Sequence, residues 1–334
     1  MLCGWPRSLT EFLKEVYFRM RYVIGGNVML DSVRFAGEKE YSRESIGGPA
    51  TFAYSGVKLF TDDVMQCSRL GEDYHELFDD WVARNGVETK GFKVVSARCN
   101  HSYLVYNADG TYGSEKFMQS VAQMGEWMQN LGYMKTSPQD FAQFTGKDTK
   151  GIYLAQNYDR VFWDQLGAVK ARDGFKIMWE IEGPSAHKEF LDQVIYDCQY
   201  VDIFSINIQE AQNLFEVEGD EACIRELQKL PVDVTLFRVG ERGLYSVTPD
   251  AVYYLPPAPG PVVDPTGCGN TSTGGALYAY AEGYDPLMVG IMANVASGQN
   301  IRQYGVIQDF AKAREEAQAQ VQELYAKYKE QYGL

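Results

Sequence analysis

The chain has 334 residues, of which 45% are hydrophobic and 23% are charged, as is typical of a soluble globular protein with a substantial core. Its 31 basic and 45 acidic residues give a net charge of −14, which argues against a partner such as duplex nucleic acid or an anionic membrane, because both need a basic face. No apolar run approaches the ~20 residues of a membrane span, and the six scattered cysteines show no C-x-x-C spacing, so we expect reduced thiols and a cytoplasmic protein.

The amino-terminal segment has no clear place in a fold. Residues 1–20 lack the apolar core and the small-residue cleavage site of a secretory signal, and the first clear strand comes directly after them. That strand, Arg21–Met29, contains the glycines of Gly25–Asn27, and Asp31 stands just beyond it. We therefore predict an extension over residues 1–20 and one α/β domain over residues 21–334.

Two polar stretches interrupt the amino-terminal half. Residues 33–46 alternate weakly between apolar and polar side chains, and residues 92–117 contain two such strands, the first at 93–97, before the hairpin turn Asn107–Gly110. Strands this polar do not suit a buried parallel sheet. We predict that they form a small separate layer, a lid over the main domain.

Elsewhere the chain alternates short apolar strands with helices, which predicts a doubly wound, mostly parallel sheet. The predicted strands, after the first, are 64–70, 152–155, 176–180, 203–206 and 234–238, with a hairpin over 243–255. The predicted helices are 50–59, 74–85, 117–150, 159–172, 186–196, 209–215, 221–229, 271–281, 286–304 and 307–332.

The stretch Val262–Gly283, VVDPTGCGNTSTGGALYAYAEG, predicts a strand, a glycine-rich turn and a tightly packed helix. Such a turn directs several backbone N–H groups and the positive end of the helix dipole at one point, which is an anion site. Gly267 and Gly269 have no Cβ, so a phosphate fits directly against the backbone, with Asn270 at the mouth of the turn. A Gly-x-Gly before a helix is equally typical of close packing alone. The turn is neither a dinucleotide fingerprint nor a Walker loop.

Polar residues follow three of the predicted strands. Asn207 and Glu210 come after one strand, Gly240–Gly243 after the next, and Asn270 after a third. Ligands bind at the carboxyl ends of parallel strands, so we expect these residues to share one site. Taken alone, Glu210 in the first turn of a helix is also a simple partner of the helix dipole.

In this order of motifs the chain resembles the ribokinase, or PfkB, family of carbohydrate and nucleoside kinases over roughly residues 22–304. The family signature D-T-x-G-A-G-D corresponds to DPTGCGN at Asp264–Asn270. The resemblance implies a ribokinase-like fold and an ATP-dependent, Mg²⁺-requiring transfer of phosphate to a hydroxyl of a small sugar, nucleoside or related alcohol. It also implies a monomer, or a homodimer that pairs through the lid.

The resemblance further assigns roles to individual residues. Phe52 stands where the family usually has an asparagine, and Arg238 where it usually has a hydroxyl residue. The implied acceptor-binding residues are Asn27, Asp31, Gly47 and Gly48; the nucleotide-binding residues are Asn207, Arg238, Gly240, Gly243, Asp264 and Asn294; the Mg²⁺ residues, direct or through water, are Glu210 and Asn207; and the catalytic residues are Gly267, Cys268, Gly269 and Asn270.

Asn270 departs from the signature. In the family this position is the aspartate that takes the proton of the attacking hydroxyl, whereas an amide is no base near neutral pH. Losing a general base costs about 10²–10⁴-fold, but each N–H donor of the turn is worth about 10²–10³-fold. Two interpretations stay open: a kinase in which water or another acid, with Asp264 the nearest candidate, takes the proton, and a non-catalytic nucleotide or sugar binder. A nicotinamide-dependent oxidoreductase lacks its glycine fingerprint.

Overall fold

The computed structural model describes residues 20–108, 112–114, 132 and 134–334. The predicted extension, apart from its last residue, and residues 117–131 and 133 of the helix predicted over 117–150 lie outside these residues. Within 135–150 one helix forms, α5 (Pro138–Phe144). It begins with a capping box in which the Ser137 and Asp140 side chains each accept from the other's backbone N–H.

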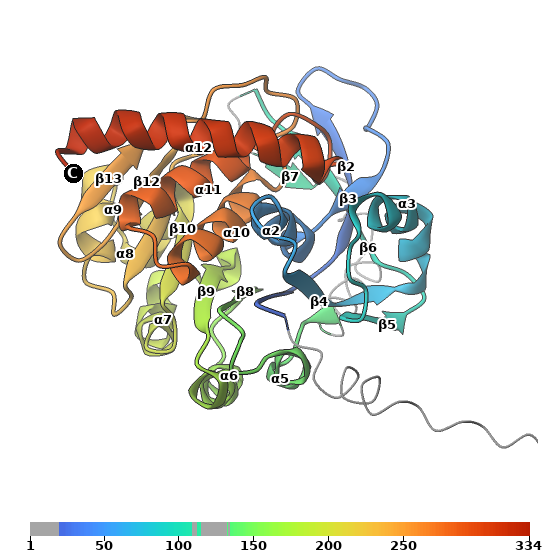
Figure 1. The fold of residues 1–334 in the computed structure, drawn as a ribbon, viewed down its shortest axis with the longest axis horizontal. Coiled ribbons are helices and arrows are strands. Elements are labelled where there is room, and N and C mark those ends of the chain that lie inside the picture. Colours follow the sequence, from blue (N-terminus) through green and yellow to red (C-terminus); the bar gives the residue numbers. More distant parts are fainter. Residues whose placement is uncertain (1–19, 109–111, 115–131, 133) are drawn as a thin grey trace, which may run out of the picture.

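In the described part of the chain, nine strands form one large sheet in the order β13-β12-β11-β10-β9-β8-β1-β4-β5 (Figure 1). Every neighbouring pair from β5 to β11 is parallel, and only β11–β12 and β12–β13 are antiparallel. The predicted doubly wound sheet is therefore confirmed. The strands are β1 (Tyr22–Gly25), β4 (Val64–Gly71), β5 (Phe92–Ser96), β8 (Gly151–Gln156), β9 (Lys176–Ile181), β10 (Ile203–Asn207), β11 (Val234–Arg238), β12 (Leu244–Val247) and β13 (Val252–Leu255).

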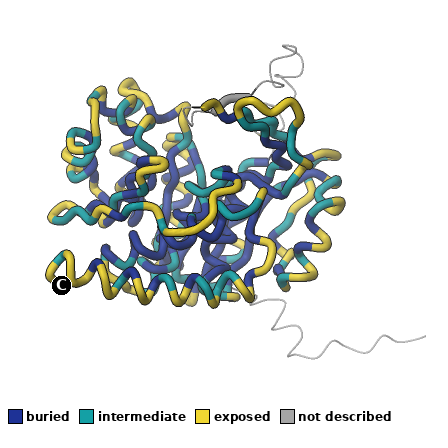
Figure 2. Tube along the Cα trace, turned by 90° about the horizontal axis from the view of Figure 1, so that it is seen from above, coloured by how far each residue is buried: buried dark blue, intermediate teal, exposed yellow. Residues whose placement is uncertain are grey.

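Helices cover both faces of the sheet, and the strand side chains alternate between them. Along β9, Met178 belongs to one hydrophobic cluster and Ile177 and Trp179 to the other, as the two-residue period of a strand requires. Buried residues fill the centre and exposed ones follow the outside (Figure 2). The first cluster contains α2 (Pro49–Lys58), α3 (His75–Asn85), α10 (Cys268–Ala281), α11 (Pro286–Asn300) and α12 (Phe310–Tyr332); the second contains α5, α6 (Arg160–Asp173), α7 (Leu191–Cys198), α8 (Ile208–Phe215) and α9 (Asp220–Leu227).

A small sheet of four strands packs beside the large one, in the order β3-β2-β6-β7. Its strands are β2 (Met29–Phe35), β3 (Ser45–Gly47), β6 (Asn100–Tyr106) and β7 (Tyr112–Ser114). The strand predicted over Arg21–Met29 is in fact two strands in two sheets, because the chain turns at Gly26, where φ is 132°. That angle suits glycine alone.

One predicted lid strand belongs to the large sheet. The strand expected at 93–97 is β5, which pairs in parallel with β4 and forms the edge of the nine-stranded sheet. Its polar pattern reflects this edge position, where Val94 is 49% exposed, and not membership of the lid.

Several helix boundaries also differ from the predictions. The helix expected from Ala186 begins at Leu191, because two short 3₁₀ turns occupy Gly183–Ser185 and Lys188–Phe190. At the carboxyl terminus, α11 ends at Asn300 and α12 begins at Phe310, so a loop replaces the predicted short break. None of the helices among the described residues combines the length and apolar character needed to cross a membrane.

Candidate active site

Residues 267–270, which we call the cradle, form the N-cap and the first turn of α10. The helix begins at Cys268 and not at Thr271 as predicted, and the buried strand predicted to end at Val262 and Val263 does not form, because both residues are exposed and belong to no strand. Gly267 is the N-cap in a left-handed conformation, with φ 74° and ψ −1°, that glycine adopts without strain. The N–H of Cys268 donates to the carbonyl of Pro265 at 3.1 Å, whereas the other three N–H groups of the cradle have no hydrogen-bond partner among the described residues. The cradle therefore offers three donors and not the four expected, because the turn itself uses one.

The Cys268 thiol takes no part in this arrangement. Its Sγ lies 3.7 Å from the Ser297 carbonyl and from Asn300 Nδ2, on the side that packs against α11. Burial raises the pKa of this thiol to about 11, so it stays neutral. Only the backbone of Cys268 belongs to the site.

Two different groups flank the cradle and explain its glycines. A Cβ on Gly267 would lie 2.2 Å from the ring of Phe52, and a Cβ on Gly269 would lie 2.0 Å from Arg238 Nη1. Further along the helix, Gly274 meets the backbone of α2 and serves packing alone. Packing thus accounts for part of the glycine pattern, but at Gly269 the neighbour is a cation, which suits an anion site. All four cradle residues remain partly exposed.

A buried carboxylate lies beside the cradle. Glu180, near the end of β9, is 5% exposed and points to the face covered by α10, as its place two residues after Met178 predicts. Its Oε2 accepts three hydrogen bonds and its Oε1 forms one ion pair. The partners are Tyr153 Oη (2.7 Å), Asn270 Nδ2 (3.0 Å), Thr273 Oγ1 (3.2 Å) and Arg238 Nη1 (2.9 Å). Burial, and next the charge of Glu180, raises the pKa of Tyr153 well above its usual value, so this hydroxyl stays a donor at neutral pH.

The site residues predicted from the sequence do not include Glu180, Tyr153 or Thr273. A signal for Glu180 was present, since an acid near the end of the apolar run KIMWEI must lie at the carboxyl edge of a parallel strand. Tyr153 and Thr273 carry no such signal. Both read as ordinary members of a buried strand and a packed helix.

The orientation of the Asn270 amide follows from this network. An ionised carboxylate only accepts hydrogen bonds, so the NH₂ end of Asn270 faces Glu180, and also lies 3.4 Å from the Tyr153 hydroxyl. Its carbonyl oxygen is therefore directed away from Glu180. At residue 270 the site presents a hydrogen-bond acceptor and no proton acceptor.

The pair predicted to bind Mg²⁺ caps a helix. Asn207 Oδ1 accepts from the Glu210 N–H at 2.9 Å, and Glu210 Oε2 accepts from the Asn207 N–H at 2.8 Å, which is a reciprocal capping box at the start of α8. Glu210 Oε2 also lies 3.9 Å from Arg238 Nη2. Burial raises the pKa of Glu210, although Arg238 opposes the shift. Asn207 is thus in register with Arg238 on the next strand, and Glu210 follows in the first turn of α8.

The four predicted acceptor-binding residues lie where β2, β3 and the start of α2 meet. Asp31 is 4% exposed, and a Cβ on Gly47 would lie 1.8 Å from its Oδ2, so only glycine fits there. Burial and then the nearby charge of Asp264 raise the pKa of Asp31 to about 7, although hydrogen bonds from Gly48 N–H and Ser102 oppose the shift.

One hydrogen bond holds this region together internally, and another joins the small sheet to the residue before the cradle. Asn27 accepts the Ala50 N–H on its carbonyl, whereas its side-chain Oδ1 is buried without a partner among the described residues. The Tyr106 hydroxyl of β6 lies 3.0 Å from Thr266 Oγ1, directly before the cradle. The small sheet therefore reaches the cradle through one hydrogen bond.

The remaining predicted nucleotide residues are held by the protein itself. Gly240 and Gly243 close the tight turn between β11 and β12, with a 3.0 Å bond between their backbones. Asp264 accepts the Thr266 N–H at 2.9 Å. Asn294 binds both the carbonyl of Pro256 and the N–H of Ala258, so its amide holds the proline-rich segment before the cradle.

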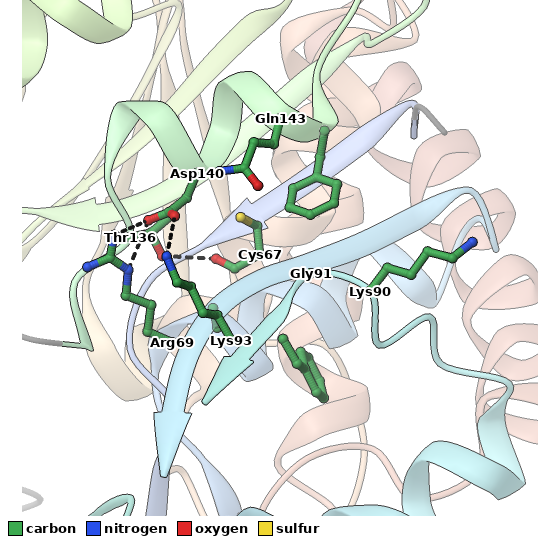
Figure 3. A pocket seen from close by; sticks show the side chains of 11 residues that line it. Cys67, Arg69, Lys90, Gly91, Lys93, Thr136, Asp140 and Gln143 are labelled. Atoms are coloured by element: carbon green, nitrogen blue, oxygen red, sulfur yellow. Dashed lines mark hydrogen bonds and ion pairs between the residues drawn. The ribbon is translucent and has the colours of Figure 1, made fainter. Parts of the chain in front are cut away.

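A cavity of the described part of the chain lies away from the cradle. It has a volume of about 170 Å³, opens between the sheet edge β4–β5 and α5, and contains none of the predicted site residues. Figure 3 shows Arg69 and Lys93 directed at Asp140 in its wall, at 2.6 and 3.9 Å. The candidate active site is instead a partly exposed surface at the carboxyl edge of the sheet.

Comparisons with known proteins concern the sequence and the fold of the whole domain. Residues 38–313 match the sequence profile described as pfkB family carbohydrate kinase. A nucleoside kinase from Methanocaldococcus jannaschii is 31% identical over 103 residues, which are 30% of this chain and 32% of that protein, so the match spans about a third of the relative's length.

Solved structures resemble the whole domain at low identity. A nucleoside kinase from Burkholderia thailandensis in complex with inosine has 17% identity and a TM-score of 0.66, over 91% of this chain and 97% of that one. An adenosine kinase from Sinorhizobium meliloti has 18% identity and a TM-score of 0.69, over 90% and 99%. An aminoimidazole riboside kinase from Salmonella enterica has 16% identity and a TM-score of 0.68, over 90% of this chain and 99% of that one. These likenesses establish a shared fold.

Proposed function

The chain belongs to the pfkB family of carbohydrate kinases, and we propose that it transfers the γ-phosphoryl group of ATP to a hydroxyl of a small sugar or nucleoside. One observation carries the proposal. Three N–H groups without a hydrogen-bond partner among the described residues lie at the start of α10, and the guanidinium of Arg238 contacts Gly269 beside them, at the edge of the sheet where ligands bind.

The cradle suits phosphoryl transfer in particular. This reaction has a loose transition state, and catalysis consists mostly of positioning and of stabilising charge on the phosphoryl oxygens. A fixed N–H donor is worth about 10²–10³-fold when charge develops on the oxygen that it faces. Arg238 adds a fixed positive charge at the same place, because its guanidinium contacts Gly269 and cannot leave Glu180 without breaking an ion pair.

A magnesium ion would be held mainly by the nucleotide. The described residues contain no group of three His, Cys, Asp or Glu side chains suited to a metal. The side-chain oxygen of Asn207 accepts the Glu210 N–H in the helix cap. Mg²⁺ keeps several waters and needs only one or two carboxylates beside the phosphates. Glu210 fits that part. When bound, the ion would neutralise charge on the phosphates.

Asp31 is our candidate for holding the acceptor. Its carboxyl, with a pKa of about 7, both accepts and donates hydrogen bonds near neutral pH, which suits vicinal hydroxyls. Asn27 supports this assignment with its buried, unpartnered oxygen. The likeness to nucleoside and adenosine kinases makes a nucleoside the first acceptor to test. The free thiols of five described cysteines support the cytoplasm as the compartment.

A second candidate is a nucleotide or nucleoside binder without turnover. Asn270 favours it, because an amide that donates to Glu180 takes no proton from a hydroxyl. Both candidates use the same surface and differ only in the chemical step.

The deciding experiment measures ADP release with Mg-ATP across a panel of nucleosides and sugars, with binding followed by calorimetry. Turnover with at least one nucleoside or sugar supports the kinase. Saturable binding of ATP and an acceptor without ADP release supports the binder. If neither ATP nor any acceptor binds, both proposals fail.

A further inference from the structure

Glu180 joins the two polar side chains that flank the cradle. Asn270 reaches its Oε2 at 3.0 Å and Arg238 its Oε1 at 2.9 Å, so one carboxylate fixes both. The next carboxylate reported near Arg238 in the described chain, that of Glu210, is 3.9 Å away and is engaged in a helix cap. The Glu180 side chain is 7% exposed, so water hardly reaches its carboxylate.

We propose that Glu180 is a positioning residue of the cradle, which sets the direction of the Asn270 amide and holds Arg238 against Gly269. This inference rests on the proposed function of the cradle. Because the carboxylate attracts the NH₂ end of the amide, the carbonyl end is left for the acceptor hydroxyl. The carboxylate that residue 270 lacks is therefore present at residue 180, which contacts Asn270 from the buried side.

The charges of this pair make the proposal testable. Asn270→Asp would place a second carboxylate about 3.0 Å from Glu180, where two carboxyl groups cannot both ionise. Glu180→Gln would deprive Arg238 of its ionic partner. The double variant Asn270→Asp/Glu180→Gln exchanges the positions of amide and carboxylate. The hydroxyls of Tyr153 and Thr273 both donate and accept, so the network can form again with its direction reversed.

The first measurement is thermal unfolding of the wild type and the three variants at pH 5 and pH 8. At pH 8 we expect Asn270→Asp to lower the melting temperature by about 5 °C. A carboxyl whose pKa is raised by its neighbour loses stability as the pH rises above its unfolded value, so the deficit should shrink by at least half at pH 5. The double variant should recover at least half of the loss at pH 8 and show no such pH dependence.

A matched control removes the same charge two residues away. Glu182 lies beyond the end of β9, where its Oε2 accepts from Asn157 and lies 4.0 Å from Lys135. The variant Asn270→Asp/Glu182→Gln should keep the full deficit of Asn270→Asp. An equal recovery with this control would show a general charge effect and would overturn the proposal.

The second measurement separates positioning from a purely structural role. We expect Glu180→Gln to weaken ATP binding about tenfold, Asn270→Asp to lower kcat at least about tenfold, and the double variant to recover both. Recovered stability with ATP affinity and kcat still depressed would reduce Glu180 to a structural residue and overturn the proposal. If a single variant does not fold, a folded double variant is itself the recovery, whereas an unfolded one contradicts the proposal.

Failure of the positioning role and failure of the kinase activity give different results. A wild type that binds ATP without turnover refutes the kinase, but recovery of stability, pH response and ATP affinity would still support Glu180 as the positioning residue. An active wild type whose double variant recovers nothing refutes the positioning role alone.

Discussion

Two buried carboxylates of this protein each pair with an arginine, and they differ in what the pair holds together. Asp140 lies 2.6 Å from Arg69 at the edge of the sheet, and Glu180 lies 2.9 Å from Arg238 beside the cradle. Asp140 also accepts hydrogen bonds from the backbone N–H and the hydroxyl of Ser137, so it helps to cap the start of α5. Glu180 instead connects two strands to the first turns of α10. The same chemistry stabilises the fold in one region and shapes the candidate site in the other.

Replacing each arginine by alanine should give the largest difference between the two regions, in both stability and activity. Arg238→Ala leaves Glu180 buried without its cation, so we expect a loss of about 3–5 kcal/mol in the free energy of unfolding. Kinase activity should fall about 10²–10³-fold. Arg69→Ala should cost only about 1 kcal/mol, because the side chain is partly exposed and Asp140 keeps its cap, and activity should stay within about twofold. Urea unfolding and initial rates measure both; equal losses of activity would contradict the comparison.

Asp31 extends the comparison to a buried carboxylate for which no ion pair is reported among the described residues. Its folded pKa of about 7 lies above the unfolded value, so the folded state holds the proton more tightly. The free energy of unfolding should therefore fall by up to about 4 kcal/mol as the pH rises from about 4 to 7. Above pH 7 it should change no further through this group. Asp31→Asn should remove this part of the pH dependence. Unfolding curves of both proteins over this range test the prediction, and identical slopes would exclude it.

Gly269 tests the contact between the cradle and its cation. A methyl group in Gly269→Ala would displace Arg238 Nη1, and we expect kcat/KM for ATP to fall about tenfold or more. Gly183→Ala is a matched control, because a Cβ there meets nothing within 4 Å. It should change kcat/KM by less than about twofold. A similar effect of both substitutions would remove the special role of the cradle.

The smallest expected difference concerns the two helix caps. Ser137→Ala and Asn207→Ala should each cost about 1 kcal/mol of unfolding free energy, since each removes an N-cap acceptor. Only Asn207→Ala should also weaken ATP binding, because Glu210 would lose its fixed position near Arg238. Calorimetry with ATP distinguishes them; weakened binding in both variants would count against the assignment of the second cap to the site.

The sequence predicts the main sheet well, and it places the glycine turn at the start of α10, although the strand predicted before that turn does not form. Apolar strands alternating with helices have few alternative arrangements, and a glycine turn before a helix directs its N–H groups by local geometry alone. β5 was misplaced because a polar edge strand and a lid strand have the same pattern. The roles of Tyr153 and Thr273 could not be predicted, because only the packing of α10 on the sheet brings them to Glu180.

The most direct test of the central claim follows the phosphorus atoms themselves. Phosphorus-31 NMR of wild type, Arg238→Ala and Gly269→Ala with Mg-ATP and the nucleoside panel would detect the transferred group. We predict a phosphomonoester signal that grows in step with ADP in the wild type and is at least about tenfold slower in both variants. No phosphomonoester with any acceptor, or equal rates in all three proteins, would contradict phosphoryl transfer at the cradle.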